Sequence, residues 1–310
     1  MPGLKDRLTD AGYGLGWSVV CRLPESWARS AFGFFADLAW RRQGPGVRVL
    51  EGNLRRVIGS AAPGGQLRAL SKEAMRSYAR YWLEAFRLPV TPADRLVGGM
   101  RDTGHIQTAL EYLAAGRGVV FALPHMGNYD LAGAWILAKG AGSVATVAER
   151  LKPESVYDRF VAFREGLGVE VLPASGGPGS AFGILAQRLR AGRLVCLVCD
   201  RDVTGGGMEV ELFGEKARIM GGPAALAVQT GAALMPVILW FEGDHWGAHI
   251  HEEIPVPAEG DREQKAAAMM QQVARVFEAG IRAHPQDWHM LQRVFVADLD
   301  PERLRRAAGS

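Results

Sequence analysis

The stretch VVFALPHMGNYD, residues 119–130, contains the pattern that decides the fold of this chain. Its first five residues form an apolar run, typical of a strand buried on both faces as in a parallel sheet. After a proline and a histidine, Gly127 allows a sharp bend and Asn128 suits a helix N-cap. The pattern therefore predicts a strand, a turn that carries His125, and a helix, with the histidine at the carboxyl end of the strand, where open α/β sheets bind ligands.

The spacing of His125 and Asp130 limits what the histidine can do. Residues five apart on one helix are rotated by about 140° and do not share a face, so His125 must lie in the turn. Asp130, in the first helical turn, can reach back to one ring nitrogen and leave the other free to accept a proton from a hydroxyl. A partly buried histidine beside an acid that favours the helix N-terminus is the other interpretation, and both stay open here.

From about residue 103 the sequence alternates between helical patterns and apolar runs, which is typical of a largely parallel sheet. The expected helices span residues 105–115, 128–139, 153–166, 181–191, 220–230 and 261–283. The expected strands span residues 118–123, 143–148, 169–172, 193–199, 208–213, 234–241 and 247–254. The predicted fold class is therefore α/β, with a central mostly parallel or mixed sheet flanked by helices and an N-terminal helical segment.

Residues 1–100 are expected to form a helical region that belongs to the same domain as an α/β core over residues 101–310. Apolar stripes with helical spacing cover residues 4–20 and 25–42, and further helices are expected near 47–58 and 71–87. Residues 1–60 hold nine Lys or Arg against five Asp or Glu. Aromatic side chains flanked by basic ones suit an anionic membrane surface, but an ordinary core-facing helix pair fits the pattern equally well.

The composition is that of a globular protein: among 310 residues, 48% are hydrophobic and 22% charged, with a net charge of +3. So small a positive balance does not indicate a nucleic-acid partner. Cys196 and Cys199 lie three apart in an apolar run, which sends their side chains to opposite faces of a strand and argues against a metal or redox pair. No clean apolar segment of a signal peptide follows the N-terminal charges.

Residues 219–241 contain no charge and are long enough to cross a bilayer. Glycines, prolines and two polar residues interrupt the segment, however, so a short helix followed by a buried strand is the favoured interpretation.

Charged residues stand directly after two expected strands and on the following helix, where apolar surroundings make them costly unless they are paired or used. They are Glu149, Arg150, Asp158, Arg164, Asp200, Arg201 and Asp202. One interpretation is a lattice of ion pairs that closes the edge of the sheet. The other is an electropositive pocket in which the three arginines bind phosphate and an acid supports the histidine.

Other chemical motifs are absent or incomplete. There is no G-x-S-x-G, and Phe182 stands where a G-x-G-x-x-G starting at Gly177 needs its last glycine. His249 and His251 would share one face of a strand, but no third ligand is apparent, so edge-strand histidines are favoured over a metal site. No metal is expected.

The ordered set of motifs resembles the bacterial late acyltransferases of lipid A, the lauroyl and myristoyl transferases. The motifs are H-x-x-x-x-D at residues 125–130, E-R-x-K-P-x-x-x-x-D-x-x-x-x-x-R-x-x-x-G at 149–168, D-R-D at 200–202, L-F-G-E at 212–215 and G-G-P-A-A-L-A at 221–227. Within that family, the ending HPQDWHMLQ, residues 284–292, is most similar to the phosphatidylinositol mannoside acyltransferases of actinobacteria.

The resemblance implies an acyl-CoA-dependent O-acyltransferase with an α/β fold, attached peripherally at the cytoplasmic face of the plasma membrane and using acyl-CoA as co-substrate without a cofactor. For the nearer branch it implies transfer of a long acyl chain, typically palmitoyl, to the 6-hydroxyl of a mannose on phosphatidylinositol mannoside. By motif, His125 matches the catalytic histidine, Asp130 the motif's acid, and Asp200, or else Asp202, an acid that assists the histidine. The expected substrate-binding residues are Glu149, Arg150, Arg164, Arg201 and Asp202.

A thioester is already activated, so such a site needs a base for the attacking hydroxyl and a donor for the oxyanion. We expect His125 as base, Asp130 or Asp200 as its partner, and backbone N–H groups near Gly127 and Asn128 as oxyanion donors. Two alternatives stay open. One is an acyltransferase for lipid A or another glycolipid, and the other is a non-catalytic protein that binds lipid or sugar phosphates in the same arginine pocket.

Overall fold

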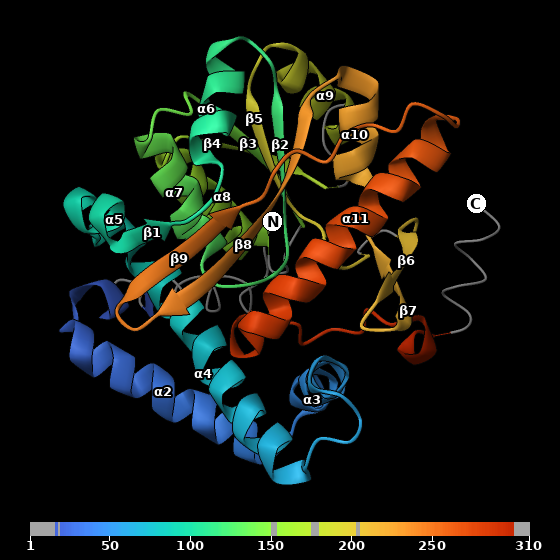
Figure 1. Ribbon diagram of the computed structural model, residues 1–310. Coiled ribbons are helices and arrows are strands. Elements are labelled where there is room, and N and C mark those ends of the chain that lie inside the picture. The colour runs from blue at the N-terminus through green and yellow to red at the C-terminus, as the bar shows by residue number, and fades with distance from the viewer. Residues whose placement is uncertain (1–15, 18, 150–153, 175–179, 203–204, 301–310) are drawn as a thin grey trace.

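The computed structural model describes residues 16–17, 19–149, 154–174, 180–202 and 205–300, and a seven-stranded sheet lies at its centre (Figure 1). The strand order is β1-β9-β8-β2-β5-β3-β4. These strands are β1 (Met100–Asp102), β2 (Val119–Leu123), β3 (Val144–Ala148), β4 (Val169–Pro173), β5 (Leu194–Val198), β8 (Ala233–Glu242) and β9 (His245–Ile250). Strands β8, β2, β5, β3 and β4 run parallel, whereas β9 is antiparallel to β8 and parallel to β1. The predicted α/β class with a mostly parallel sheet is confirmed.

Helices cover both faces of this sheet (Figure 1). One face packs against α5 (Ala93–Gly99), α6 (Ile106–Ala114), α7 (Tyr129–Ala138) and α8 (Glu154–Gly166). The other packs against α9 (Ala181–Arg190), α10 (Gly222–Thr230) and α11 (Arg262–Ala283). Short 3-10 helices span Leu88–Val90, Pro285–Asp287 and Val296–Asp298. The sheet is therefore the middle of three layers.

Strand β2 explains why the sequence shows a continuous apolar run. Val119, Phe121 and Leu123 belong to the hydrophobic cluster on the α6–α7 face, and Val120 and Ala122 belong to the cluster on the α10–α11 face. All five side chains are buried. A strand covered on both faces has no polar face to alternate with its apolar one.

The uncharged segment 219–241 forms a helix and a central strand, as favoured from the sequence. Helix α10 ends at Thr230, and Gly231 follows with φ 75°, the left-handed cap that glycine adopts readily. Strand β8 then pairs with β2 on one side and β9 on the other. In the described part of the chain no helix has both the length and the apolar character needed to cross a membrane.

The prediction that the side chains of Cys196 and Cys199 point to opposite faces is confirmed. Cys196 packs against the cluster on the α6–α7 face, and Cys199 belongs to the cluster on the opposite face. Both thiols are free.

Two parts of the fold differ from the prediction. Residues 208–213 were expected as a strand of the alternating series, but β6 (Met208–Leu212) forms a separate antiparallel hairpin with β7 (Glu215–Ile219). At the hairpin turn Phe213 and Gly214 have φ 53° and 78°, the pair of positive values typical of a tight type I′ turn. Strand β1 and helix α5 were not predicted, because three and seven residues are too few to show a period.

The N-terminal region consists of α2 (Glu25–Arg42), α3 (Pro45–Ile58) and α4 (Gly64–Arg87), which pack around their own hydrophobic cluster. Helix α4 begins earlier than the predicted residue 71. The Asn53 amide of α3 donates to the carbonyls of Met290 and Gln292, at 2.8 and 2.9 Å. Residues 19–22 are helical, and most of the helix expected at 4–20 lies outside the described residues.

Candidate active site

The turn between β2 and α7 has the local structure that the sequence predicts. Gly127 adopts φ 58°, and a Cβ atom there would lie 2.7 Å from the Leu239 carbonyl carbon, so only glycine fits. The Asn128 side-chain oxygen accepts the Leu131 N–H at 3.0 Å, which caps α7. His125 thus lies in the turn at the carboxyl end of β2 and not in the helix.

His125 faces Asp200, because β2 and β5 are neighbours in register. Leu123 pairs with Val198, and His125 and Asp200 each follow two residues later in their own strands' direction. The Nδ1 atom of His125 and Oδ1 of Asp200 are 2.5 Å apart, and Asp200 Oδ2 accepts the His125 backbone N–H at 2.9 Å. With Nδ1 bound to the carboxylate, Nε2 is the nitrogen left for a substrate proton.

The Asp200 carboxylate is ionised although it is 1% exposed. Burial by itself raises its pKa, but the charge and hydrogen bonds of His125 and a third hydrogen bond outweigh burial and hold the pKa below its ordinary value. That third bond comes from Trp288 Nε1, 2.9 Å from Asp200 Oδ2. The His125 side chain is 23% exposed, so the pair joins a buried carboxylate to an imidazole that substrate can reach.

The C-terminal segment after α11 forms backbone hydrogen bonds with the turn that carries His125. The Gly127 N–H donates to the Asp287 carbonyl at 3.1 Å, and the His289 N–H donates to the His125 carbonyl at 2.8 Å. The Gly127 N–H was expected to bind the oxyanion. That expectation is wrong, because this N–H donates to the Asp287 carbonyl. Sequence reasoning did not assign a role to this segment, although its histidines and tryptophan marked the resemblance.

A buried polar network lies behind the turn. Ser77 Oγ is 2.6 Å from Asp287 Oδ1 and 2.8 Å from His289 Nε2, and the other Asp287 oxygen accepts the Phe241 N–H at 3.0 Å. Burial, together with the charge of His125, lowers the pKa of His289 to about 3, so its ring is neutral. Burial raises the pKa of Asp287 above its ordinary value. None of these three residues was singled out in the sequence as a site residue.

Asp130 is not the hydrogen-bond partner of the His125 ring, which corrects one of the two expected pairings. Its carboxylate is paired with Arg164, with Nε at 2.6 Å and Nη2 at 3.1 Å, and accepts the Tyr81 hydroxyl at 2.8 Å. The Asp130 and Arg164 side chains are 5% and 18% exposed. Burial lowers the pKa of Arg164, but Asp130 outweighs burial and keeps the guanidinium charged. Two nitrogens of Arg164 are thereby occupied, and binding of substrate phosphate by this residue stays a prediction.

Three of the remaining predicted residues, Glu149, Arg201 and Asp202, lie near the carboxyl edge of the sheet, as His125 does. Arg201 Nη2 donates to Glu149 at 2.9 Å, and its Nη1 donates to the Gln292 side chain. Asp202 accepts the Gly205 N–H at 2.8 Å and lies 3.7 Å from Arg218 Nε of β7. Of the two acids in D-R-D, the structure therefore places Asp200 against the histidine. Arg150 lies outside the described residues.

A cavity of about 360 Å³ opens beside His125, within the range of small-molecule sites. Its polar lining near the carboxyl edge of the sheet includes His125, Glu149, Arg201 and Gln292. Its apolar lining continues under α7 and reaches Val144 and Val169, the first residues of β3 and β4. The cavity therefore follows the α7 face of the sheet over roughly 13 Å of strand length. This shape suits a molecule with a polar end beside His125 and an extended apolar chain.

The remaining candidates from the sequence do not join this site. The His249 and His251 rings lie 4.3 Å apart, at the end of β9 and directly after it, and Thr103 Oγ1 is 2.9 Å from His249 Nδ1. The expected edge-strand position is wrong, because β9 pairs with β1 on one side and β8 on the other. Among the described residues, no group of three or more His, Cys, Asp or Glu side chains is arranged to hold a metal ion.

Comparisons with known proteins agree with this architecture. The family model described as bacterial lipid A biosynthesis acyltransferase matches residues 7–296. A phosphatidylinositol mannoside acyltransferase of Mycolicibacterium smegmatis is 47% identical over 303 residues, covering 98% of this chain and 96% of that protein. A protein of the same name from Mycobacterium tuberculosis (strain H37Rv) is 46% identical over 302 residues, covering 95% and 91%. From the match over nearly its whole length, the chain belongs to the bacterial lipid A biosynthesis acyltransferase family and is an acyltransferase.

Proposed function

We propose that this acyltransferase moves a long-chain fatty acyl group, palmitoyl, from acyl-CoA to the 6-hydroxyl of a mannose on phosphatidylinositol mannoside. The observation that carries the proposal is the His125–Asp200 pair at the polar mouth of an apolar cavity. The two relatives that cover almost the whole chain are named for this acceptor. The acceptor therefore follows from the relatives, and the chemistry follows from the geometry.

In the proposed reaction His125 is the general base. Its Nε2 takes the proton of the mannose hydroxyl while the oxygen attacks the thioester carbonyl carbon. The carbon–sulfur bond then breaks, the sulfur leaves as the CoA thiolate, and the proton held by His125 passes to it. Asp200 keeps Nδ1 protonated throughout and stabilises the imidazolium that forms, so no covalent acyl-enzyme is needed.

The cavity supports binding of the acyl chain. Phe121, Trp135 and Leu239 are among its apolar lining residues, and they come from β2, α7 and β8. An extended hydrocarbon chain in this space buries its surface at about 25 cal/mol per Å². The thioester carbonyl then lies at the mouth, beside His125.

The polar groups at the mouth support binding of the two head groups. Arg201 and Glu149 line the cavity and are joined to each other, which leaves a mixed acidic and basic rim for sugar hydroxyls and phosphates. We assign substrate binding to this pair first. Arg164 also lines the cavity, but its ion pair with Asp130 makes support of the site its main role.

We further propose that α2 attaches the enzyme to the cytoplasmic face of the plasma membrane as a peripheral protein. Trp27, Phe34 and Phe35 are 70%, 64% and 63% exposed, and their spacing places them on one helix face. Ala36, which lies opposite Trp27 around the helix, is buried, and so is Ala28. Exposed arginines at 41 and 42 follow at the end of the helix and attract anionic lipids. Acyl-CoA, as a water-soluble donor, reaches the enzyme from the aqueous side.

The transfer proposal is tested with palmitoyl-CoA and a panel of acceptors. Phosphatidylinositol mannosides with different numbers of mannoses, a lipid A precursor and no acceptor are compared by thiol release and by mass spectrometry of the product. We expect acceptor-dependent thiol release, a palmitoyl group on the mannose, and loss of most turnover in His125→Ala. His245→Ala, an exposed histidine on β9, is the control. An acylated lipid A precursor would replace the proposed acceptor, and an intact thioester with every acceptor would favour a binding protein.

Membrane attachment is tested by replacing Trp27, Phe34 and Phe35 together with serine. Because these side chains are mostly exposed, the variant keeps its melting temperature but no longer sediments with vesicles that contain anionic lipid. Phe182→Ser, at an exposed aromatic residue of α9, is the matched control. Equal vesicle binding by all three proteins would exclude α2 as the anchor.

A further inference from the structure

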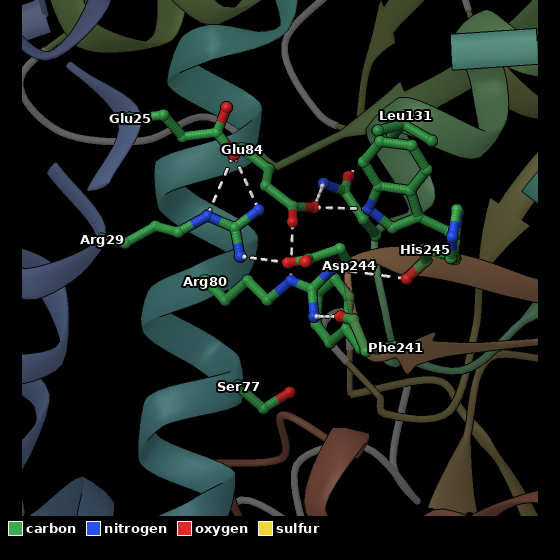
Figure 2. Close-up of polar contacts among 12 residues, drawn as sticks. Glu25, Arg29, Ser77, Arg80, Glu84, Leu131, Phe241, Asp244 and His245 are labelled. Carbon is green, nitrogen blue, oxygen red and sulfur yellow. Dashed lines mark hydrogen bonds and ion pairs between the residues drawn. The ribbon is translucent and has the colours of Figure 1, made fainter. Parts of the chain in front are cut away.

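Helix α4 carries a glutamate, Glu84, whose side chain is only 11% exposed and lies against the start of α7 (Figure 2). A buried carboxylate is costly unless donors surround it. Glu84 has three donors from three parts of the chain. Trp246 Nε1 of β9 and Asn128 Nδ2 of the active-site turn bind Oε2 at 2.7 and 3.0 Å, and Arg80 Nε of α4 binds Oε1 at 2.6 Å.

The contact with Asn128 bears directly on the active-site turn. An asparagine amide has one acceptor end and one donor end, so its orientation is set only when both ends have partners. The oxygen of Asn128 accepts the Leu131 N–H and caps α7, and the nitrogen donates to Glu84. A rotation of the amide by 180° would turn its oxygen toward the carboxylate and its nitrogen toward an N–H donor.

We infer that Glu84 is a positioning residue for the general base, acting through Asn128 on the turn that carries His125. Asn128 stands three residues after His125, with Gly127 between them, so its position limits the path of the turn. Glu84 is not among the described residues that line the cavity. It therefore acts on the turn and not on the substrate, and the inference rests on the proposed role of His125.

The other contacts of Arg80, one of the three donors to Glu84, fix the position of the Glu84 carboxylate. Arg80, which binds Glu84, also donates to the carbonyls of Gly243 and His245 at 2.6 and 3.3 Å, and its guanidinium lies 4.1 Å from the centre of the Phe241 ring. These residues belong to the β8–β9 turn and the strand ends beside it (Figure 2). Helix α4 is thus tied to the sheet on one side and to the active-site turn on the other.

The first test is Glu84→Gln, which keeps the volume but replaces one acceptor oxygen with a donor. Two donors, from Trp246 and Asn128, face Oε2, so the amide oxygen takes that place, the NH₂ group faces Arg80 Nε, and the remaining bond from Asn128 loses the charge of the carboxylate. We expect kcat for palmitoyl transfer to fall by about 10-fold or more, with little change in the KM for palmitoyl-CoA, because the acyl cavity is untouched. The change in melting temperature is measured on the same preparations.

Glu51→Gln on α3 is a matched control. The Glu51 side chain is 16% exposed and accepts hydrogen bonds from Arg68 at 2.7 Å and Ser71 at 2.8 Å, but it contacts no residue of the active-site turn. We expect Glu51→Gln to lower the melting temperature about as much as Glu84→Gln while kcat stays at the wild-type value. Equal losses of kcat in the two variants, or an unchanged kcat in Glu84→Gln, would overturn the inference.

Exchanging the donor and the acceptor between Asn128 and Glu84 distinguishes an effect of their hydrogen bond from a general effect on packing. Asn128→Asp keeps the cap on Leu131 but places two carboxylates in contact, so kcat falls. In Glu84→Gln/Asn128→Asp the glutamine turns its NH₂ group toward the new carboxylate and its oxygen toward Arg80 Nε, and it gives up the bond from Trp246. We expect kcat to recover several-fold relative to Asn128→Asp. A double variant with a kcat at or below the product of the two single effects would contradict the pairing.

A spectroscopic measurement keeps this inference separate from the proposed reaction. The ¹⁵N shifts of the His125 imidazole report which ring nitrogen carries the proton. We expect the wild type and Glu51→Gln to share one tautomer pattern and Glu84→Gln to show a mixed or exchange-broadened one. If palmitoyl transfer is absent in the wild type, the proposed function fails, and this comparison still decides the role of Glu84. Identical spectra in all three proteins would reject that role.

Discussion

His125 Nδ1 lies 2.5 Å from Asp200 Oδ1, and the other oxygen of the Asp200 carboxylate accepts the backbone N–H of the same histidine. The acid therefore holds both the ring and the main chain of His125. Ring orientation and turn geometry are set together, which is what a general base needs in order to meet a hydroxyl in one direction.

Replacing Asp200 by asparagine reverses the proton position on His125. Two N–H donors, from His125 and Trp288, face Oδ2, so the amide oxygen takes that place and the NH₂ group faces Nδ1. The ring then carries its proton on Nε2 and cannot act as a base. We expect Asp200→Asn to lower kcat by about 10²- to 10⁴-fold, measured by thiol release from palmitoyl-CoA.

Asp298→Asn is the control for this variant, because it weakens an ion pair with Arg56, neither residue of which lines the cavity. Comparable transfer by Asp200→Asn and the wild type would remove Asp200 from the mechanism.

Trp288→Phe deletes the buried indole N–H while it leaves an aromatic ring in place. The Asp200 pKa lies below its ordinary value of 3.8, so the hydrogen bonds to this carboxylate stabilise the folded protein above that pH and stop doing so as the pH falls through the folded pKa. We expect Trp288→Phe to be about 1.5–3 kcal/mol less stable near pH 7, with a smaller difference below about pH 4. Urea unfolding at several pH values measures it, and a pH-independent difference would indicate lost packing alone.

Asp130 and Arg164 should affect stability more than chemistry. Removing Asp130 leaves the Arg164 guanidinium buried without a partner, which typically costs about 3–5 kcal/mol. We expect Asp130→Leu to lose stability on this scale and Asp130→Leu/Arg164→Met to regain much of it, in urea unfolding. A stable Asp130→Leu variant that loses transfer as completely as Asp200→Asn would instead assign Asp130 to the reaction.

His289 should make the stability depend on pH. Its pKa is lowered from 6.5 to about 3. Between these two pH values, His289 binds a proton in the unfolded chain but not in the folded protein. Stability from this residue is complete above pH 6.5 and is lost as the pH falls toward 3, at up to about 1.4 kcal/mol per pH unit. His289→Gln should flatten the dependence of unfolding free energy on pH between 6.5 and 4, whereas His245→Gln should not. Parallel curves of unfolding free energy against pH for His289→Gln and the wild type would show that the pKa of His289 is not lowered in the folded protein.

Much of the fold was predictable because its signals are local. The apolar run of β2, the glycine of the following turn and the Asn128 cap are features of consecutive residues, and each has the predicted structure. The hairpin strand β7 was missed although Ala217 and Ile219 alternate with charged residues, because five residues give too short a period. Its tight turn at Phe213 was missed because a bulky residue rarely has a positive φ.

The sequence by itself determined that His125 lies in a turn at the end of a buried strand, because spacing and turn residues act over a few positions. It did not determine which acid meets the imidazole, since Asp130 is close in the chain and Asp200 is far from it. The tertiary structure decided for Asp200, because β5 pairs with β2 in a register that brings the residues two beyond Leu123 and Val198 together. It also decided that Asp130 binds Arg164, and that Glu84 and Trp288 hold the turn and the acid. Such contacts join residues distant in the chain, and only packing brings them together.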